Sequence, residues 1–214
     1  MSVTKRLPLS RRRILEAAVQ FVDREGLEAL SMRKLGAELG VEAMSLYNHV
    51  PNKGALLDGM VDLLLGELEV PSEDKDWEER IREAYRTFRH LAHEHPNVFP
   101  LFVARPPHTM DGAWLVEDFL KTLRRAGFDA QTTLHAFRAL SSYTVGYAMA
   151  EIWGFAMEPT GSQPGAWQLP AEKFPYISEL KFYLEEVDRD AEFEFGLDLI
   201  FAGLRAKLVR KSTA

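Results

Sequence analysis

Residues 31–50, SMRKLGAELGVEAMSLYNHV, carry the pattern that decides the fold. Ser31 can cap a short helix whose apolar residues recur at helical spacing until Gly40 interrupts them. A second short helix is expected from about residue 43 to residue 50, because Pro51 cannot continue it. Glycine accepts the positive φ that such a turn needs. Two short helices joined by a glycine-containing turn predict a helix-turn-helix.

The outer face of the second helix indicates what this motif contacts. By topology alone, a helical hairpin inside an all-α core is the simpler interpretation. The polar residues at 47–49 and the Lys53 that follows make a poor core and favour a surface facing DNA phosphates, and side chains of this mixture fit a major groove roughly 12 Å wide. The expected packing residues are Leu35, Leu39, Val41 and Leu46, and the expected outer residues are Ala43, Met44, Ser45, Tyr47, Asn48 and His49.

The remaining sequence predicts helices throughout, and no segment alternates as a strand does. We therefore expect an all-α fold with a three-helix helix-turn-helix DNA-binding domain (1–52) and a larger helical domain for ligand binding and dimerisation (53–214). Proline and glycine break the pattern at 96–100, 104–108 and 158–175. Outside the motif, helices are expected at about 11–25, 53–68, 77–93, 110–126, 129–156 and 190–210.

Charge is distributed unevenly along the chain. The 214 residues carry a net charge of −6, but residues 1–53 hold nine Lys and Arg against six Asp and Glu. A basic head on an acidic body suits a protein that meets phosphate at one end, although a solvated tail explains the basic start equally well. The sequence has no cysteine, which excludes disulfides and thiolate sites. We expect a cytoplasmic protein with no membrane contact, because no secretory signal or membrane span is recognisable.

The segment SMRKLGAELGVEAMSLYNHVPNKGALLDGM resembles the DNA-binding segment of the TetR family of bacterial repressors. The similarity runs from Leu15 to about Met60 and includes LGV, SLY, HV and the K-x-x-LL beginning at Lys53. Later parts resemble the tetracycline-repressor branch more weakly, at Trp77-x10-Phe88, Arg105-Pro106 and FEFGLDLIFAGL (193–204). The resemblance implies an all-α homodimer that uses the helices at 129–156 and 190–210 for pairing.

The resemblance also implies roles for individual residues. Arg33 matches an arginine that reads a guanine edge, and Ser31 lies where a helix N-terminus can meet phosphate. Ala43 and Met44 fall at base-reading positions where the best-known member has Gln and Pro, so the operator should differ. Glu42 could accept from a cytosine N4, but a role in capping the helix N-terminus is preferred. Ser45, Tyr47, Asn48 and His49 match phosphate or base-edge contacts, and Lys53 matches a phosphate clamp.

The larger domain is expected to bind a small-molecule effector different from tetracycline. The stretch PLFVARP lacks the family histidine that binds magnesium, and of the drug contacts only Phe88 matches, so a largely apolar effector is expected with no metal or cofactor. His90, His93 and His95 lie close in sequence, but solvated or capping roles are preferred to a zinc site. The pocket candidates, each also explicable as core, are Phe88, Phe99, Phe102, Met110, Trp114, Tyr143, Tyr147, Trp153 and Trp167.

These expectations combine into a ligand-responsive transcriptional regulator, a repressor that an effector releases from palindromic double-stranded operator DNA. Two other classes stay open. An all-α enzyme would need a nucleophile–base pair, a phosphate loop or a metal set, and none is recognisable. A ligand-binding or scaffold protein with a vestigial helix-turn-helix would not bind DNA sequence-specifically.

Overall fold

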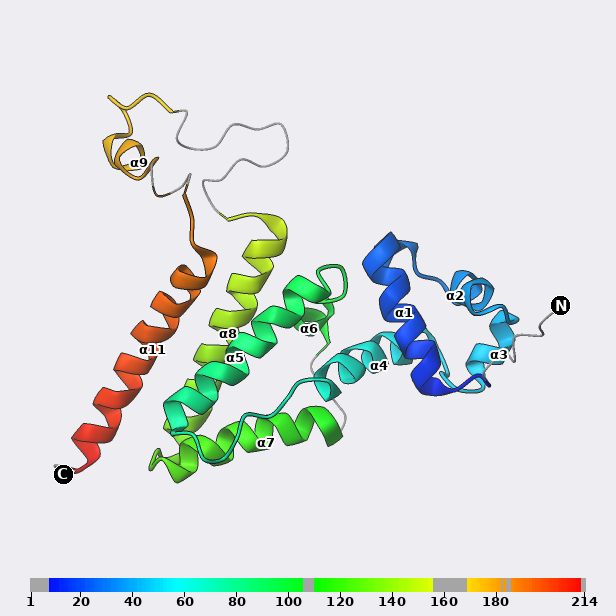
Figure 1. The fold of residues 1–214 in the computed structure, drawn as a ribbon, viewed down its shortest axis with the longest axis horizontal. Coiled ribbons are helices and arrows are strands. Elements are labelled where there is room, and N and C mark those ends of the chain that lie inside the picture. Colours follow the sequence, from blue (N-terminus) through cyan, green and yellow to red (C-terminus); the bar gives the residue numbers. More distant parts are fainter. Residues whose placement is uncertain (1–7, 106–109, 156–168, 182, 184–185, 213–214) are drawn as a thin grey trace. The chain divides into compact units, whose positions relative to one another are not determined.

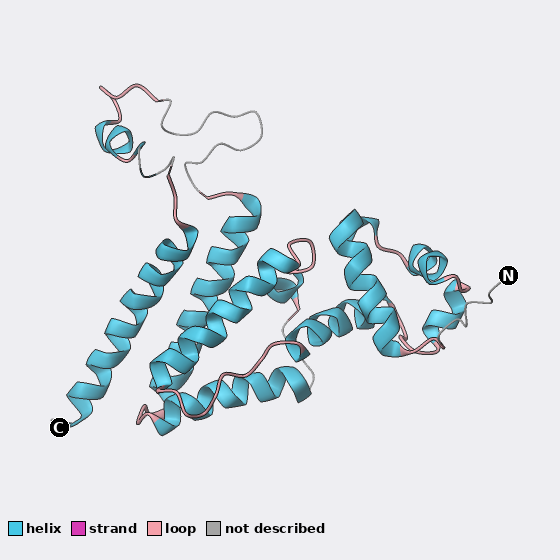
Figure 2. Cartoon of the chain, viewed as in Figure 1, coloured by secondary structure: helices cyan, strands magenta, loops and turns pink. Residues whose placement is uncertain are grey.

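The computed structural model describes residues 8–105, 110–155, 169–181, 183 and 186–212, which form helices and loops but no strand (Figure 2). The predicted all-α class is confirmed. None of the described helices is long and apolar enough to cross a lipid bilayer. The helices are α1 (Arg11–Glu25), the 3-10 turn η1 (Leu27–Ala29), α2 (Met32–Leu39), α3 (Ala43–Tyr47), α4 (Lys53–Gly66), α5 (Trp77–Glu94), α6 (Leu101–Ala104), α7 (Met110–Arg125), α8 (Ala130–Trp153), α9 (Pro175–Glu179) and α11 (Arg189–Ser212).

The helix boundaries follow the capping signals of the sequence closely. Ser10 caps α1 by accepting a hydrogen bond from the Arg13 backbone N at 3.2 Å, and Asp129 caps α8 in the same way. The prediction for the third helix was too long, because α3 ends at Tyr47 and a turn closes after it, with His49 N donating to Leu46 O. The short helices η1 and α9 were not predicted. Much of the predicted loop at 158–175 lies outside the described residues.

The chain packs as two compact units. The first contains residues up to 70 together with 90–118, and the second contains 71–89 together with 119 onward. In the first unit, α1 packs against both α4 and α2 (Figure 1). The approach of α1 to α4 is close, because a Cβ added at Gly59 would lie 2.7 Å from Leu15 Cδ2. The fully buried residues of the first unit include Ile14, Val22, Leu35, Leu46, Leu56 and Met60.

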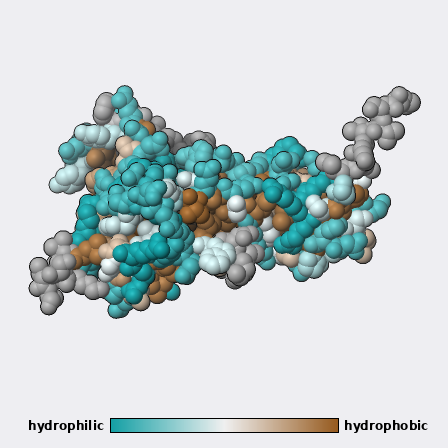
Figure 3. Space-filling view, turned by 60° about the horizontal axis from the view of Figure 1, so that its bottom comes forward, coloured by the Kyte–Doolittle hydropathy of each residue, from teal (hydrophilic) through white to brown (hydrophobic). Residues whose placement is uncertain are grey.

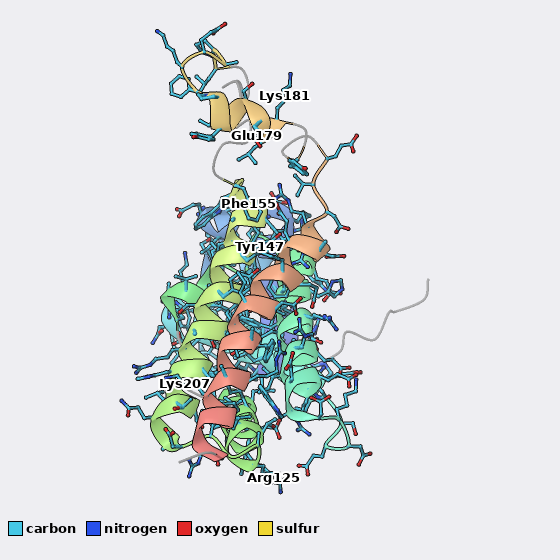
Figure 4. All side chains as sticks on the ribbon, turned by 90° about the vertical axis from the view of Figure 1, so that its left-hand side faces the viewer. Arg125, Tyr147, Phe155, Glu179, Lys181 and Lys207 are labelled. Atoms are coloured by element: carbon cyan, nitrogen blue, oxygen red, sulfur yellow. The ribbon has the colours of Figure 1, made fainter. Side chains whose placement is uncertain are left out.

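The second unit is built around the first part of α5 with α8 and α11, and α8 runs beside α11 in Figures 1 and 4. Trp77 packs edge-on against Phe128 with ring centroids 5.2 Å apart, and the Tyr85 hydroxyl lies 2.9 Å from Ser141 Oγ. Tyr147, labelled in Figure 4, donates a hydrogen bond to Arg189 O at the start of α11. The buried core includes Ile81, Tyr85, Phe119, Leu123, Phe128, Leu140, Phe193, Leu197 and Phe201.

Arginines on one face of α5 bind carboxylates of α8 and α11. The most enclosed pair is Arg89 and Glu151, whose side chains are 8% and 9% exposed and whose Nε and Oε2 atoms lie 2.8 Å apart. Glu151 raises the pKa of Arg89 by hydrogen bonding, so this guanidinium stays charged. We call these residues the arginine ladder; its further pairs are Arg82 with Glu194 and Asp198, Arg86 with Glu194, and Arg89 with Asp190.

Several large hydrophobic residues of the second unit remain exposed. Leu134 and Trp153 of α8 are exposed, as are Phe195 and Leu199 of α11. Figure 3 shows one face of the molecule, on which hydrophobic residues reach the surface in patches within a mostly hydrophilic covering. Exposed apolar helix faces of this kind are typical of surfaces that a partner covers.

Candidate nucleic-acid interface

The turn between α2 and α3 is fixed by two glycines. Gly40 ends α2 in the left-handed conformation, with φ +66°, as predicted. Gly36 was not singled out from the sequence, yet a Cβ there would lie 2.9 Å from Val41 O and 3.2 Å from Ala43 N. Both neighbours are backbone atoms, so they cannot move aside as a side chain would. The absence of a side chain at residue 36 therefore sets how closely α3 approaches α2.

The helix α3 buries one side and exposes the other. Leu46 is fully buried, whereas Met44 is 73% and Tyr47 is 41% exposed. Asn48 and His49 are exposed in the turn that follows, and Ala43 and Ser45 are partly exposed. The structure thus exposes four of the six predicted contact residues of this segment and leaves Ala43 and Ser45 half-buried.

The N-terminal turn of α2 presents further candidates. Ser31 caps α2 by accepting from Lys34 N at 3.3 Å. Arg33 and Lys34 point outward, and among the described residues neither forms an ion pair or a side-chain hydrogen bond. Their charges are therefore available to a partner. A helix N-terminus with adjacent cations is a suitable place for a phosphate group.

Two other candidate residues lie at the starts of α4 and α3. Lys53 does not simply extend into solvent, because its Nζ donates a hydrogen bond to Leu30 O at 2.8 Å and so joins the start of α4 to the residue before Ser31. An ammonium group has three donors, so two remain for phosphate. Glu42 occupies the N-cap position of α3, but its side chain makes no capping hydrogen bond. The preferred capping role of its carboxylate was wrong.

The segment that follows α5 contacts α1 and α4 of the same unit. His95 Nδ1 lies 2.7 Å from Asp23 Oδ2, and Asn97 Nδ2 donates to Asp23 O at 2.9 Å. Arg105 forms an ion pair with Asp58 of α4. Nothing in the sequence spacing could indicate these contacts, since the partners are far apart along the chain.

The three clustered histidines do not form one site. His95 pairs with Asp23, so the preferred solvated or capping role for this residue was wrong. His90 faces Glu94 at 3.6 Å. Among the described residues, no group of three or more His, Cys, Asp or Glu side chains could hold a metal ion.

The predicted effector-contacting residues fall in both compact units. Phe99 is fully buried and pairs with Phe102 in the first unit, where Trp114 is exposed. In the second unit, Phe88 packs on the core and Trp153 is exposed. Tyr143 donates to Phe193 O at 2.9 Å, so both it and Tyr147 hold the α11 backbone. Met110 begins α7, and Trp167 lies outside the described residues.

Comparison with protein families supports the transcriptional-regulator class. A model described as the bacterial regulatory proteins of the tetR family matches residues 14–60, and one described as the tetracyclin repressor-like C-terminal domain matches residues 70–208. The chain belongs to the TetR family. The TetR-family helix-turn-helix identified from residues 31–50 is thereby confirmed.

Individual TetR-family relatives match over nearly the whole chain. The transcriptional repressor DrrR1 of Streptomyces coeruleorubidus is 33% identical over 93% of this chain and 78% of its own length. The class A tetracycline repressor from transposon 1721 of Escherichia coli is 30% identical over 89% of this chain and 88% of its own. The structure of ActR from Streptomyces coelicolor with actinorhodin gives a TM-score of 0.80 at 33% identity, covering 94% of this chain and 99% of that one.

Membership of the TetR family establishes the general function. The chain is a ligand-responsive, DNA-binding transcriptional regulator, and it acts as a dimer. Its relatives are transcriptional regulators rather than enzymes.

Proposed function

We propose that this chain represses transcription by binding a palindromic operator, with α3 of each protomer in successive major grooves. Half-site centres in such complexes lie about one helical turn, roughly 34–36 Å, apart. The observation that carries the proposal is the outer face of α3, where Met44 and Tyr47 are exposed while Leu46 behind them is fully buried. That arrangement leaves the polar and apolar side chains of the face free for base edges and phosphates.

The contacts are proposed residue by residue. The Arg33 guanidinium reads the O6 and N7 atoms of a guanine, and Ser31 with the α2 N-terminus binds a phosphate. Lys53 binds a phosphate with the donors that Leu30 O leaves free. Ala43 and Met44 read bases, and Ser45, Tyr47, Asn48 and His49 contact phosphates or base edges.

A small, largely apolar effector is proposed to release the operator. ActR has been crystallised with actinorhodin, and a TetR variant from Acinetobacter baumannii with minocycline, which supports a small organic ligand for this chain too. The aromatic candidates named above supply apolar contacts. Residues 95–105, which touch α1 and α4, provide a route by which the effector state reaches the DNA-reading helices. The free energy that couples effector binding to operator release cannot exceed the difference between the effector's binding free energies for the operator-bound and operator-released conformations.

Three broader assignments complete the proposal. Residues 1–52 read DNA, and residues 53–214 bind the effector and form the dimer through α8 and α11, whose exposed apolar side chains support this role. The protein works in the cytoplasm, where its operator lies. It has no catalytic activity of its own.

Binding selection on random double-stranded DNA tests the proposal, followed by titration of the selected site at several salt concentrations. We expect one palindromic sequence, bound with an affinity that falls linearly on a logarithmic salt scale. A scaffold protein with a vestigial motif, or an enzyme, would enrich no sequence. Light scattering after size exclusion should give twice 24.3 kDa, and a monomer at micromolar concentration would contradict the two-fold operator model.

A further inference from the structure

The first turn of α3 presents one large apolar side chain to solvent. Met44 is 73% exposed, more than any other large hydrophobic residue described in α1–α4. We propose that Met44 reads the 5-methyl group of a pyrimidine in each half of the operator. This inference rests on the proposed function, because it assumes that α3 enters the major groove.

Chemistry at the start of α3 excludes most other base features. Ala43 and Met44 carry no hydrogen-bond donor, and the Glu42 carboxylate can only accept. The side chains of residues 42–44 therefore cannot donate to N7 or O6 of a purine, and Ser45 is the nearest residue of this turn that could. In the major groove, the base feature that apolar side chains contact is the 5-methyl group of thymine. The start of the recognition helix is also the part that usually contacts base edges.

Packing determines which of the two apolar residues does the reading. Leu46 is fully buried, and this fixes the rotation of α3 about its axis. Met44 then shares the outer face with Tyr47 and Asn48, which follow it at helical spacings of three and four. Ala43 is short and partly buried, so it reaches less far than Met44. The methionine side chain is unbranched and polarisable, which suits contact with a methyl group.

The methyl group can come from two bases, thymine or 5-methylcytosine. Burying one methyl-sized group contributes about fourfold in affinity for each half-site, and about fifteenfold when both half-sites are changed. A protein that reads this group should lose that factor when thymine is replaced by deoxyuridine. It should also bind 5-methylcytosine more tightly than cytosine at the same position.

The experiment uses the full-length protein and its selected operator. Each symmetric pair of thymines is replaced by deoxyuridine, and the affinity is measured for the wild type, Met44→Ala, Met44→Leu and Tyr47→Ala. Cytosine and 5-methylcytosine are then compared at the responsive pair. Met44 is exposed, so Met44→Ala should fold, and its melting temperature serves as the check.

We expect one thymine pair whose demethylation weakens the wild type about fifteenfold and Met44→Ala less than twofold. Met44→Leu and Tyr47→Ala should keep the dependence on the methyl group. The wild type should bind 5-methylcytosine more tightly than cytosine, whereas Met44→Ala should bind the two equally. The proposal is overturned if no thymine pair responds, or if Met44→Ala responds as strongly as the wild type. Failure to select any operator would instead contradict the proposed function.

Discussion

The reading head (α1–α4) and the arginine ladder of the second unit use charged side chains in opposite ways. In the head, Arg33 and Lys34 are exposed and bind no described side chain. In the ladder, Arg82, Arg86 and Arg89 each bind at least one carboxylate within 2.8 Å. The fold therefore neutralises the three ladder arginines and leaves Arg33 and Lys34 of the head available.

This difference explains why net charge is a poor guide to the partner of this protein. The chain as a whole carries a charge of −6, yet the exposed cations that the fold leaves without a carboxylate can still attract DNA phosphates. Basic residues bound within the bundle contribute to its packing and little to the field near α2 and α3.

Replacing Glu151 by Gln should destabilise the protein by about 3–5 kcal/mol, because it leaves the enclosed Arg89 charge without its main partner. Urea unfolding at a fixed protomer concentration measures the change. The matched control is Asp190→Asn, since Asp190 also binds Arg89 but its side chain is 86% exposed. Asp190→Asn should lower the free energy of unfolding by less than about 1 kcal/mol. Equal losses of stability in the two variants would mean that burial does not determine how much each ion pair contributes.

Replacing Gly36 by Ala should destabilise the head by about 1–3 kcal/mol, because the new Cβ meets the backbone of residues 41 and 43. Operator affinity should fall with it, since α3 must move away from α2. Gly66→Ala is the control: an added Cβ there has nothing within 4 Å, and alanine favours a helix by about 1 kcal/mol. Unchanged DNA binding by Gly36→Ala would show that the α2–α3 approach is adjustable.

Replacing Arg33 by Ala should reduce operator affinity by about 1–3 kcal/mol and relax specificity at one position of each half-site. The reason is the loss of a planar fork that fits a guanine edge. Arg33→Lys keeps the charge but not the fork, so it should lose specificity while keeping the salt dependence. A uniform loss of affinity for all sequences would assign Arg33 to phosphate instead.

Replacing Lys53 by Ala should flatten the logarithmic salt dependence of binding by about one unit per protomer without changing sequence preference. Because Lys53 also holds Leu30 O, a small loss of thermal stability is expected. Lys53→Gln can keep the hydrogen bond but not the charge, and it separates the two roles. An unchanged salt slope in both variants would remove Lys53 from the phosphate contacts.

Local signals made the helices and the reading motif predictable from sequence. Ser10, Ser31 and Gly40 act within a few residues of themselves, and their capping or turn roles appear in the structure. The Asp23–His95 contact and the arginine ladder were not predicted, because ion pairs between distant residues leave no periodic pattern. The role of Gly36 was not predicted for a related reason, because a glycine is needed there only when α2 and α3 pack together.

The shape of the α2–α3 turn depends on the buried residues Leu35, Gly36 and Leu46 and on the left-handed backbone of Gly40. The exposed residues of α3 contribute little to that packing, so they can be exchanged at small cost in stability. Selection can therefore change the operator sequence of such a regulator by altering Met44 or its neighbours while the scaffold stays intact. A lineage can thus acquire new target genes without having to evolve a new fold.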